Sequence, residues 1–186
     1  MYRTESGTGD ALLVVVGDSI TNEGRVEIAA RFDRDRRVVI DGRPGYLIGA
    51  QQPTAVALAA MGPSAVIIAL GTNDAVYAHD PVASAGDLRR LVDTFGSVSC
   101  IVLVTVNTRL PRAGAPARAL ALNEAIRSLA AGDPRLRVVD VDRVAADAES
   151  DAGFVAPFLY DGVHPTAAGQ ARLAAAYAAA VASCPA

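Results

Sequence analysis

Apolar residues along the chain gather in five short runs, and the segments between them show helical periodicity. The runs cover residues 11–16, 37–40, 64–70, 99–105 and 136–141. Short apolar runs with few polar interruptions are typical of parallel strands that are buried on both faces. The sequence therefore predicts five strands at these positions.

Amphipathic and apolar segments alternate with these strands. In residues 22–32, the apolar side chains of Val26, Ile28 and Phe32 predict a helix whose charged residues face outward. Further helices are predicted over residues 53–61, 81–95, 117–131 and 142–152, and from Thr166, whose hydroxyl suits an N-cap, to about residue 182. Strands that alternate with helices in this way predict a parallel sheet covered on both faces.

The length and composition fit one globular domain. The chain has 186 residues, of which 52% are apolar and 20% charged, and this content suits a buried core. We expect the domain to span residues 11–186, after a polar, flexible lead-in at residues 1–10 that lacks the apolar segment of a signal peptide. As it stands, the sequence therefore predicts a cytoplasmic protein.

Charge and residue spacing exclude several classes of partner. The net charge is −3, and Lys and Arg form no dense stripe, so we expect no nucleic-acid partner. No run reaches the roughly 18 apolar residues that a membrane span needs. No group of residues has the spacing of metal ligands, and no phosphate-binding glycine motif follows a strand. We therefore expect neither a metal nor a cofactor.

Four loops with polar and glycine residues follow predicted strands or precede the last helix. They are residues 17–21, 42–45, 71–74 and 161–165. In open α/β sheets, ligands bind beyond the carboxyl ends of the strands, and the parallel topology brings all four loops to that edge. We therefore expect the chemistry of the protein there.

Ser19 and His164 are the residues at this edge that suit nucleophilic catalysis. A serine hydroxyl is a weak nucleophile until a base accepts its proton, and imidazole suits that task near neutral pH. Asp161 precedes His164 by three residues, so that its carboxylate can orient the ring and stabilise its protonated form. The alternative is that Ser19 is only a turn residue and that Asp161 and His164 only cap the last helix.

Acyl transfer through such a serine also needs hydrogen-bond donors for the developing oxyanion. The candidates are the backbone N–H groups of Ser19 and Gly45 and the side-chain amide of Asn73. The alternative is that Asn73 is an ordinary turn residue and that Gly45 supplies only a positive φ. Asp74 is interpreted as a turn residue, and His79 as a surface residue.

The two cysteines, Cys100 and Cys184, are either separate thiols or a disulfide. Cys100 begins a predicted strand and Cys184 ends the last helix. Because the helices run antiparallel to the strands, both residues are expected at the same end of the sheet. The simpler expectation is two separate thiols, and the alternative is a disulfide, which would indicate an oxidising compartment.

Taken together, the four loops resemble the sequence blocks of the SGNH, or GDSL-type, hydrolase family. The matching segments, in the family's order, are Gly17-Asp18-Ser19-Ile20, the glycine loop ending at Gly45, Gly71-Thr72-Asn73-Asp74 and Asp161-Gly162-Val163-His164-Pro165. The resemblance implies a flavodoxin-like three-layer α/β/α sandwich with a five-stranded parallel sheet. It also implies Ser19 as nucleophile, His164 as base and Asp161 as the residue that orients the base.

The same resemblance implies an oxyanion hole formed by Ser19, Gly45 and Asn73. Gly42 is a rival for Gly45, because Arg43-Pro44 departs from the small residues usual in that block.

A narrower resemblance concerns residues 106–112, Asn123 and Val139-Asp140. These residues resemble the SGNH domains that are fused to membrane acyltransferase domains, including those that O-acetylate cell-wall sugars. This resemblance implies an extracytoplasmic domain of a larger protein, in which a Cys100–Cys184 bridge would fit. The alternative is an ordinary loop with solvated arginines.

We therefore predict a serine esterase that cleaves small O-acyl esters, such as acetyl esters, through an acyl-enzyme. Two alternatives stand beside it: an O-acyltransferase domain that moves the acyl group to a sugar hydroxyl, and a catalytically silent carbohydrate-binding module. In each case the partner is a small-molecule or carbohydrate ester. Candidates for substrate contact are Tyr46, Tyr77, Phe154, Phe158 and Tyr160, with Arg109 for a polar or anionic acceptor.

Overall fold

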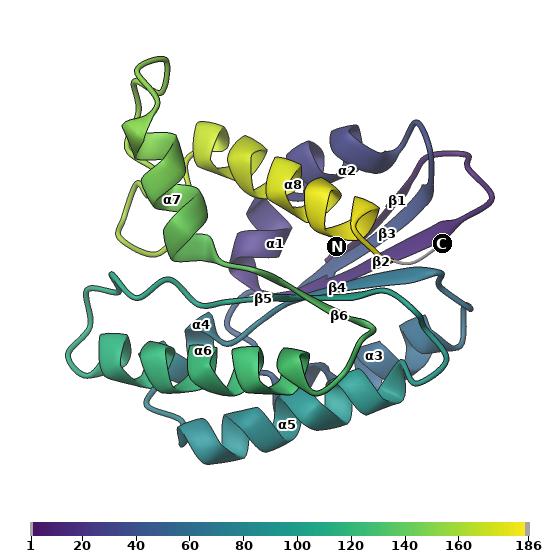
Figure 1. Ribbon diagram of the computed structural model, residues 1–186, viewed down its shortest axis with the longest axis horizontal. Coiled ribbons are helices and arrows are strands. Elements are labelled where there is room, and N and C mark those ends of the chain that lie inside the picture. Colours follow the sequence, from purple (N-terminus) through teal and green to yellow (C-terminus); the bar gives the residue numbers. More distant parts are fainter. Residues whose placement is uncertain (1, 185–186) are drawn as a thin grey trace.

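Strands form at all five apolar runs and at one further segment near the N-terminus. The computed structural model describes residues 2–184, in which six strands make one sheet in the order β1-β3-β2-β4-β5-β6 (Figure 1). The strands are β1 (Arg3–Ser6), β2 (Leu12–Gly17), β3 (Arg37–Gly42), β4 (Ala65–Ala69), β5 (Ile101–Val104) and β6 (Leu136–Val139). The five predicted strands pair in parallel, so their carboxyl ends lie along one edge.

Helices cover both faces of this sheet, as the strands that are apolar on both sides require. Figure 1 shows α2, α7 and α8 on one face and α3, α5 and α6 on the other. The helices are α1 (Ser19–Glu23), α2 (Arg25–Phe32), η1 (Gly49–Gln51), α3 (Gln52–Ala59), α4 (Thr72–Val76), α5 (Pro81–Thr94), α6 (Ala115–Ala131), α7 (Val141–Ser150) and α8 (Ala167–Ala182). The fold is thus a three-layer α/β/α sandwich. Within residues 2–184, no helix has the length and apolar character needed to cross a membrane.

The central strand β2 contributes to two separate cores. Its side chains alternate, with Val14 and Val16 packed toward the layer of α5 and α6, and Leu13 and Val15 packed toward α2 and α8. All four are completely buried. This double burial explains why the strand is apolar at successive positions, and it fixes the place of the loop that follows β2.

The segment predicted as a flexible lead-in contains an additional strand, so the expectation of five strands, all parallel, is wrong by one. β1 pairs antiparallel with β3, with Thr4 opposite Ile40. The Arg3 guanidinium also binds Asp41 on β3, with 3.2 Å between Nε and Oδ2. A polar edge strand is held by backbone pairing and shows no apolar pattern, which explains why the hydrophobic periodicity missed it. Residue 1 of the predicted lead-in and residues 185–186 of the predicted domain lie outside the described residues.

The helix predicted over residues 22–32 is two helices. α1 begins three residues earlier, at Ser19, and Gly24 separates it from α2. The Gln170 side chain from α8 packs at this break, where its Nε2 donates to Ile20 O at 3.1 Å and its Oε1 fills the space that a Cβ on Gly24 would need. A short helix, α4, also replaces the turn predicted after β4.

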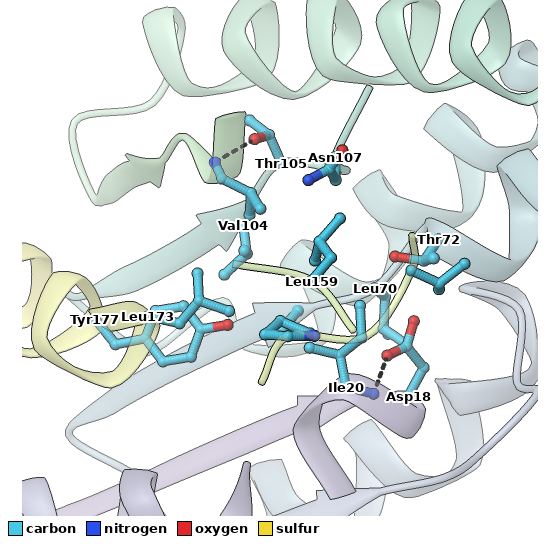
Figure 2. A pocket seen from close by; sticks show the side chains of 14 residues that line it. Asp18, Ile20, Leu70, Thr72, Val104, Thr105, Asn107, Leu159, Leu173 and Tyr177 are labelled. Carbon is cyan, nitrogen blue, oxygen red and sulfur yellow. Dashed lines mark hydrogen bonds between the residues drawn. The ribbon is translucent and has the colours of Figure 1, made fainter. Parts of the chain in front are cut away.

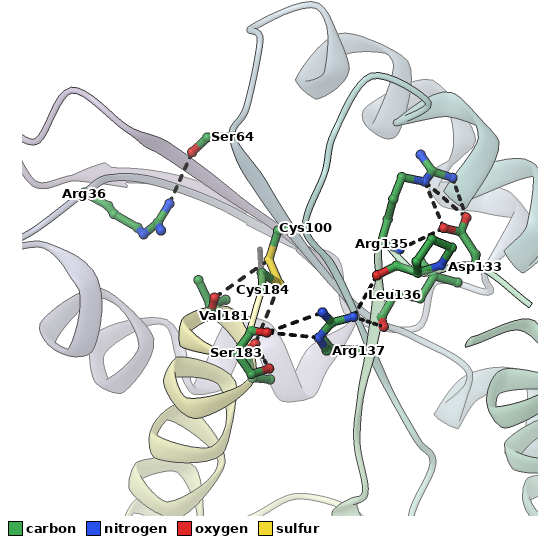
Figure 3. The surroundings of a disulfide bond; sticks show 12 residues. Arg36, Ser64, Cys100, Asp133, Arg135, Leu136, Arg137, Val181, Ser183 and Cys184 are labelled. Carbon is green, nitrogen blue, oxygen red and sulfur yellow. Dashed lines mark hydrogen bonds and ion pairs between the residues drawn. A yellow bond between two sulfur atoms is a disulfide. The ribbon is translucent and has the colours of Figure 1, made fainter. Parts of the chain in front are cut away.

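Cys100 and Cys184 form a disulfide, so the expectation of two separate thiols is wrong. The bond joins the residue before β5 to the residue that follows Ser183 at the end of α8, with 5.6 Å between the Cα atoms (Figure 3). Beside it, the Arg137 guanidinium of β6 donates to Ser183 O at 3.3 Å. The last helix is therefore fastened to the sheet at the end opposite the carboxyl edge.

Candidate active site

Ser19 stands at the first position of α1, directly after β2. Asp18 caps the helix, because its Oδ1 accepts a hydrogen bond from the Ile20 N–H at 3.0 Å. Gly17 allows the helix to begin this close to the strand, since a Cβ there would overlap the Thr21 hydroxyl. The turn therefore places Ser19 at the carboxyl edge of the sheet.

The structure brings Ser19, His164 and Asp161 together, and we call these three residues the rim triad. Ser19 Oγ lies 2.9 Å from His164 Nε2, and His164 Nδ1 lies 2.7 Å from Asp161 Oδ2. Because an ionised carboxylate can only accept, the proton belongs on Nδ1, and Nε2 accepts from the Ser19 hydroxyl. In this arrangement an imidazole can remove a proton from serine.

The loop before α8 is folded around Asp161. Its Oδ1 accepts hydrogen bonds from the backbone N–H groups of Val163 at 2.9 Å and His164 at 2.7 Å, while Oδ2 accepts from the ring. Gly162, with a φ of 81°, allows the tight turn. Burial raises the pKa of Asp161, but these hydrogen bonds outweigh it and lower the pKa to about 2. The carboxylate therefore stays ionised beside the imidazole.

The predicted oxyanion donors lie at the same edge, in the first turns of α1 and α4 and in the loop after β3. Ser19 occupies the first turn of α1, where backbone N–H groups have no partner within the helix. Gly45 has a φ of 78° and no atom within 4 Å of the place a Cβ would take, so a ligand can approach its backbone closely. Asn73 Nδ2 donates one proton to Tyr46 O at 3.0 Å and keeps a second for a ligand. The rival Gly42 is the last residue of β3, and its N–H already donates to Tyr2 O at 3.1 Å, which favours Gly45.

Asp74, interpreted as a turn residue, is instead the centre of a second polar group. Its side chain is 1% exposed. Oδ2 accepts from the Ile48 N–H at 3.1 Å, and Oδ1 accepts from the Ser84 hydroxyl at 2.8 Å. His79, interpreted as a surface residue, is half-buried, with Nδ1 2.9 Å from Ser84 Oγ. We call Asp74, Ser84 and His79 the anchor cluster. Burial raises the pKa of Asp74 against the hydrogen bonds from Ser84 and Ile48, which lower it.

A small cavity of about 30 Å³ lies in the protein beside α1, between the ends of β4 and β5 (Figure 2). Asp18, Asn107 and Tyr177 bring polar atoms to its wall, and Ile20 and Leu159 line it with apolar ones. Asn107 Nδ2 is buried and has no hydrogen-bond partner within residues 2–184. Asp18 is 2% exposed, and burial raises its pKa to about 7 against the hydrogen bond from the Ile20 N–H. Asp18 is thus a buried acid directly beneath the rim triad.

Two of the predicted substrate residues flank the oxyanion donors. Tyr46 follows Gly45 directly and is 37% exposed, and Tyr77 ends α4 and is 57% exposed. Each ring carries an arginine over its face, Arg43 at 5.6 Å from the Tyr46 centroid and Arg112 at 6.0 Å from that of Tyr77. These amphipathic rings border the open side of the site.

Tyr160 lies on the other side of the rim triad. Its ring stacks on the His164 ring with 5.8 Å between centroids, and its hydroxyl donates to Glu23 Oε2 at 3.2 Å. Burial and the neighbouring Glu23 carboxylate raise the pKa of Tyr160. The ring therefore covers one face of the imidazole.

Three other predicted substrate contacts are bound or packed elsewhere in the structure. Phe158 is completely buried in the core under α8, so the prediction that it touches substrate is wrong. Phe154, also proposed for the pocket, packs beside it at 6.5 Å between ring centroids. Arg109 is bound to Glu149 of α7, with 2.9 Å between Nη1 and Oε2. An aromatic loop composition does not distinguish rings that face the core from rings that face the ligand.

No group of three or more His, Cys, Asp and Glu residues arranged to hold a metal ion occurs among residues 2–184. The polar groups at the carboxyl edge form hydrogen bonds with one another instead.

The comparison with protein families agrees with this geometry. Residues 15–172 match the model of the GDSL-like lipase/acylhydrolase family. The chain belongs to this family. The matched segment includes all three residues of the rim triad and all three predicted oxyanion donors. No curated protein sequence matches the chain.

Solved structures share the fold over almost the whole chain. Axe2, an acetylxylan esterase from Geobacillus stearothermophilus whose catalytic mutant was crystallised, has a TM-score of 0.75 at 19% identity, covering 93% of this chain and 94% of its own. The C-terminal catalytic domain of peptidoglycan O-acetyltransferase A (OatA) from Streptococcus pneumoniae has a TM-score of 0.73 at 19% identity, with coverages of 96% and 98%. A member of the lipolytic G-D-S-L family from Veillonella parvula has a TM-score of 0.74 at 16% identity, with coverages of 91% and 97%. At these identities the similarity concerns the fold alone.

Proposed function

We propose that this protein is a serine esterase that cleaves small O-acyl esters through an acyl-enzyme. The observation that carries the proposal is the unbroken chain of contacts from Ser19 Oγ through both ring nitrogens of His164 to Asp161, at 2.9 and 2.7 Å. A serine, a base and an orienting carboxylate in this order make an activated nucleophile. Membership of an acylhydrolase family supports the same reaction class.

The proposed reaction begins when Ser19 Oγ attacks the ester carbonyl carbon and its proton passes to His164 Nε2. The carbonyl oxygen becomes an oxyanion, which the N–H groups of Ser19 and Gly45 and the Asn73 amide stabilise. The imidazolium then gives its proton to the departing alcohol, leaving Ser19 acylated. Water, deprotonated by His164, attacks the acyl carbon, and the acid and free serine are released. Asp161 remains ionised throughout and stabilises the imidazolium.

A small acyl group attached to a sugar is the proposed substrate. The exposed rings of Tyr46 and Tyr77 border the site, and such amphipathic rings suit a carbohydrate face. Axe2, which shares the fold, is an acetylxylan esterase. Acetyl esters of sugars therefore agree with both the site and the neighbour.

Hydrolysis of p-nitrophenyl esters of increasing acyl length tests this proposal. We expect the acetyl ester to give the highest kcat/KM, and a fluorophosphonate to label the wild type at Ser19 but not Ser19→Ala. If neither turnover nor labelling occurs while acetylated or plain glycans bind, the protein is a catalytically silent carbohydrate-binding module instead.

A second candidate is an O-acyltransferase that passes the acyl group to a sugar hydroxyl. The OatA catalytic domain, with the same fold, is a peptidoglycan O-acetyltransferase domain. The Cys100–Cys184 disulfide supports an oxidising compartment, where such a domain fused to a membrane acyltransferase would work. Product analysis with an acetyl donor and chitooligosaccharide acceptors separates the two, since a transferase yields acetylated sugar and an esterase yields only acetate.

A further inference from the structure

The loop that carries Gly45 is fastened at two points to α4, which carries Asn73. The Asn73 Nδ2 group donates to Tyr46 O at 3.0 Å. Two residues further along the loop, the Ile48 N–H donates to Asp74 Oδ2 at 3.1 Å. Adjacent residues of α4 therefore hold both ends of the segment that directly follows Gly45.

The second oxygen of the same carboxylate extends this connection to α5. Asp74 Oδ1 accepts from the Ser84 hydroxyl at 2.8 Å, and His79 Nδ1 lies 2.9 Å from the same hydroxyl oxygen. The His79 backbone N–H also donates to Asp74 O at 2.9 Å. Since Asp74 and Ser84 are each 1% exposed, the loop, α4 and α5 meet at one carboxylate that water hardly reaches.

We propose that Asp74 is a positioning residue of the oxyanion hole, which fixes the distance between the Gly45 N–H and the Asn73 amide. The inference rests on the proposed function, because it assigns Gly45 and Asn73 to one oxyanion. Such donors work only when they are already in place as charge develops. Asp74 lies behind them and touches no substrate, so it acts through the backbone of residues 45–48.

Replacing Asp74 by Asn tests this role while nearly preserving its shape. An amide offers one acceptor oxygen where the carboxylate offers two. Its NH2 group therefore faces either the Ile48 N–H, donor against donor, or the Ser84 hydroxyl, whose proton must then turn away from residue 74. Removal of one oxyanion donor costs roughly 100- to 1,000-fold in kcat. Because D74N displaces donors without removing them, we expect kcat to fall by roughly 10- to 100-fold with KM within about twofold. Asp80→Asn is the matched control, since Asp80 only caps α5 from the surface, and it should leave both constants unchanged.

A double-mutant cycle with Asn73→Ala shows whether Asp74 acts through the oxyanion hole. We expect N73A to lower kcat by roughly 100-fold or more, and D74N to add little on that background. If N73A leaves kcat unchanged, the oxyanion hole itself is wrongly assigned. If N73A lowers kcat but D74N does not, or if the two losses multiply in full, the role of Asp74 is overturned and the proposed function stands.

A second variant keeps the inference testable if D74N does not fold, as its thermal unfolding would show. Ser84→Ala removes one hydrogen bond to Asp74 and leaves the bond to Ile48 in place. We expect a loss in kcat of about threefold to tenfold, again with KM unchanged and again absent on the N73A background. A loss of equal size on both backgrounds would contradict the proposal.

Discussion

The chain contains two groups of serine, histidine and aspartate, the rim triad and the anchor cluster, and they are connected in different orders. In the rim triad the imidazole stands in the middle, with Nε2 toward the Ser19 hydroxyl and Nδ1 toward Asp161. In the anchor cluster the Ser84 hydroxyl stands in the middle, 2.9 Å from His79 Nδ1 and 2.8 Å from Asp74 Oδ1. His79 Nδ1 itself lies 3.6 Å from Asp74 Oδ1. Only the first order lets a base take a proton on one side while a carboxylate stabilises it from the other.

Exposure separates the two groups as well. Ser19 is partly exposed at the carboxyl edge, whereas Ser84 is 1% exposed inside the protein. The same three residue types therefore make a nucleophile in one place and a structural fastening in the other. The comparison shows that the order in which the three side chains contact one another, and their access to substrate, determine whether the group can catalyse a reaction. The residue types alone do not.

Removing the serine hydroxyl from one group or from the other should give the largest difference in kcat between two matched variants. Ser19→Ala eliminates the nucleophile, and we expect kcat for p-nitrophenyl acetate to fall by roughly 10,000-fold or more. Ser84→Ala should retain at least about a tenth of the activity, because its hydroxyl contacts no reacting atom. Initial rates for both purified variants, with circular dichroism as the check on folding, make this measurement. Similar losses in the two variants would mean that the rim triad is not the catalytic group.

Replacing the aspartate of one group or of the other by asparagine should give the next largest difference in kcat. In Asp161→Asn the side chain no longer offers a charge to the imidazolium, and the wrong tautomer of His164 is favoured, so we expect kcat to fall by about 1,000- to 10,000-fold. This loss should exceed the one for D74N by at least about tenfold, since Asp74 has no contact with His164. Equal kcat values for the two Asn variants would contradict the separate roles of the two carboxylates.

Much of this site follows from the sequence because the relevant residues sit at the ends of regular elements. Ser19 follows an apolar run, and Asp161 and His164 share one short loop, so a parallel sheet alone brings them to one edge. The five buried strands were predictable for the same reason, since burial on both faces leaves continuous apolar runs.

The anchor cluster could not be predicted in this way. Asp74 looks like a turn residue, and its partners Ile48 and Ser84 come from other segments, so their contacts depend on tertiary packing. β1 was missed because an edge strand of Arg3–Ser6 needs no apolar residues. Phe158 was misplaced because an apolar ring in a loop fits the core and the substrate side equally well.

The pKa shifts of the buried and exposed carboxyls should have opposite consequences for stability. Asp18 has a pKa of about 7 in the folded protein against an ordinary 3.8, so the folded state keeps its proton while the unfolded state loses it. The free energy of unfolding should therefore fall as pH rises from about 4 to 7, by on the order of 4 kcal/mol from this group. Asp161, with a pKa of about 2, stabilises the fold above about pH 4, and this contribution is lost as pH falls toward 2.

Urea unfolding of the wild type and of Asp18→Asn between pH 3 and 8 measures how the free energy of unfolding depends on pH, and so tests both expectations. The variant should show a smaller decline between pH 4 and 7, because an amide does not titrate and only the contribution of Asp74, whose pKa burial also raises, remains. It should keep the loss of stability below pH 4. Asp161→Asn should keep the decline between pH 4 and 7 and lose only part of the loss of stability below pH 4, since Asp133, Asp140 and Asp151 also have lowered pKa values. If Asp18→Asn has the same pH dependence as the wild type, Asp18 does not retain its proton in the folded state.

The smallest expected effect concerns how each histidine is held. His79 is held by the Ser84 hydroxyl, whereas the His164 ring has, besides its two hydrogen bonds, the ring of Tyr160 stacked on it at 5.8 Å. An aromatic stack contributes about 0.5–1.5 kcal/mol, so Tyr160→Ala should lower kcat/KM by roughly threefold to tenfold. Tyr160→Phe, which keeps the ring and loses only the bond to Glu23, should stay within about twofold of the wild type. Leu120→Ala, an exposed side chain on α6 in the other helix layer, serves as the control. Equal losses in the Phe and Ala variants would show that the hydroxyl bond to Glu23, and not the stacked ring, holds the imidazole in place.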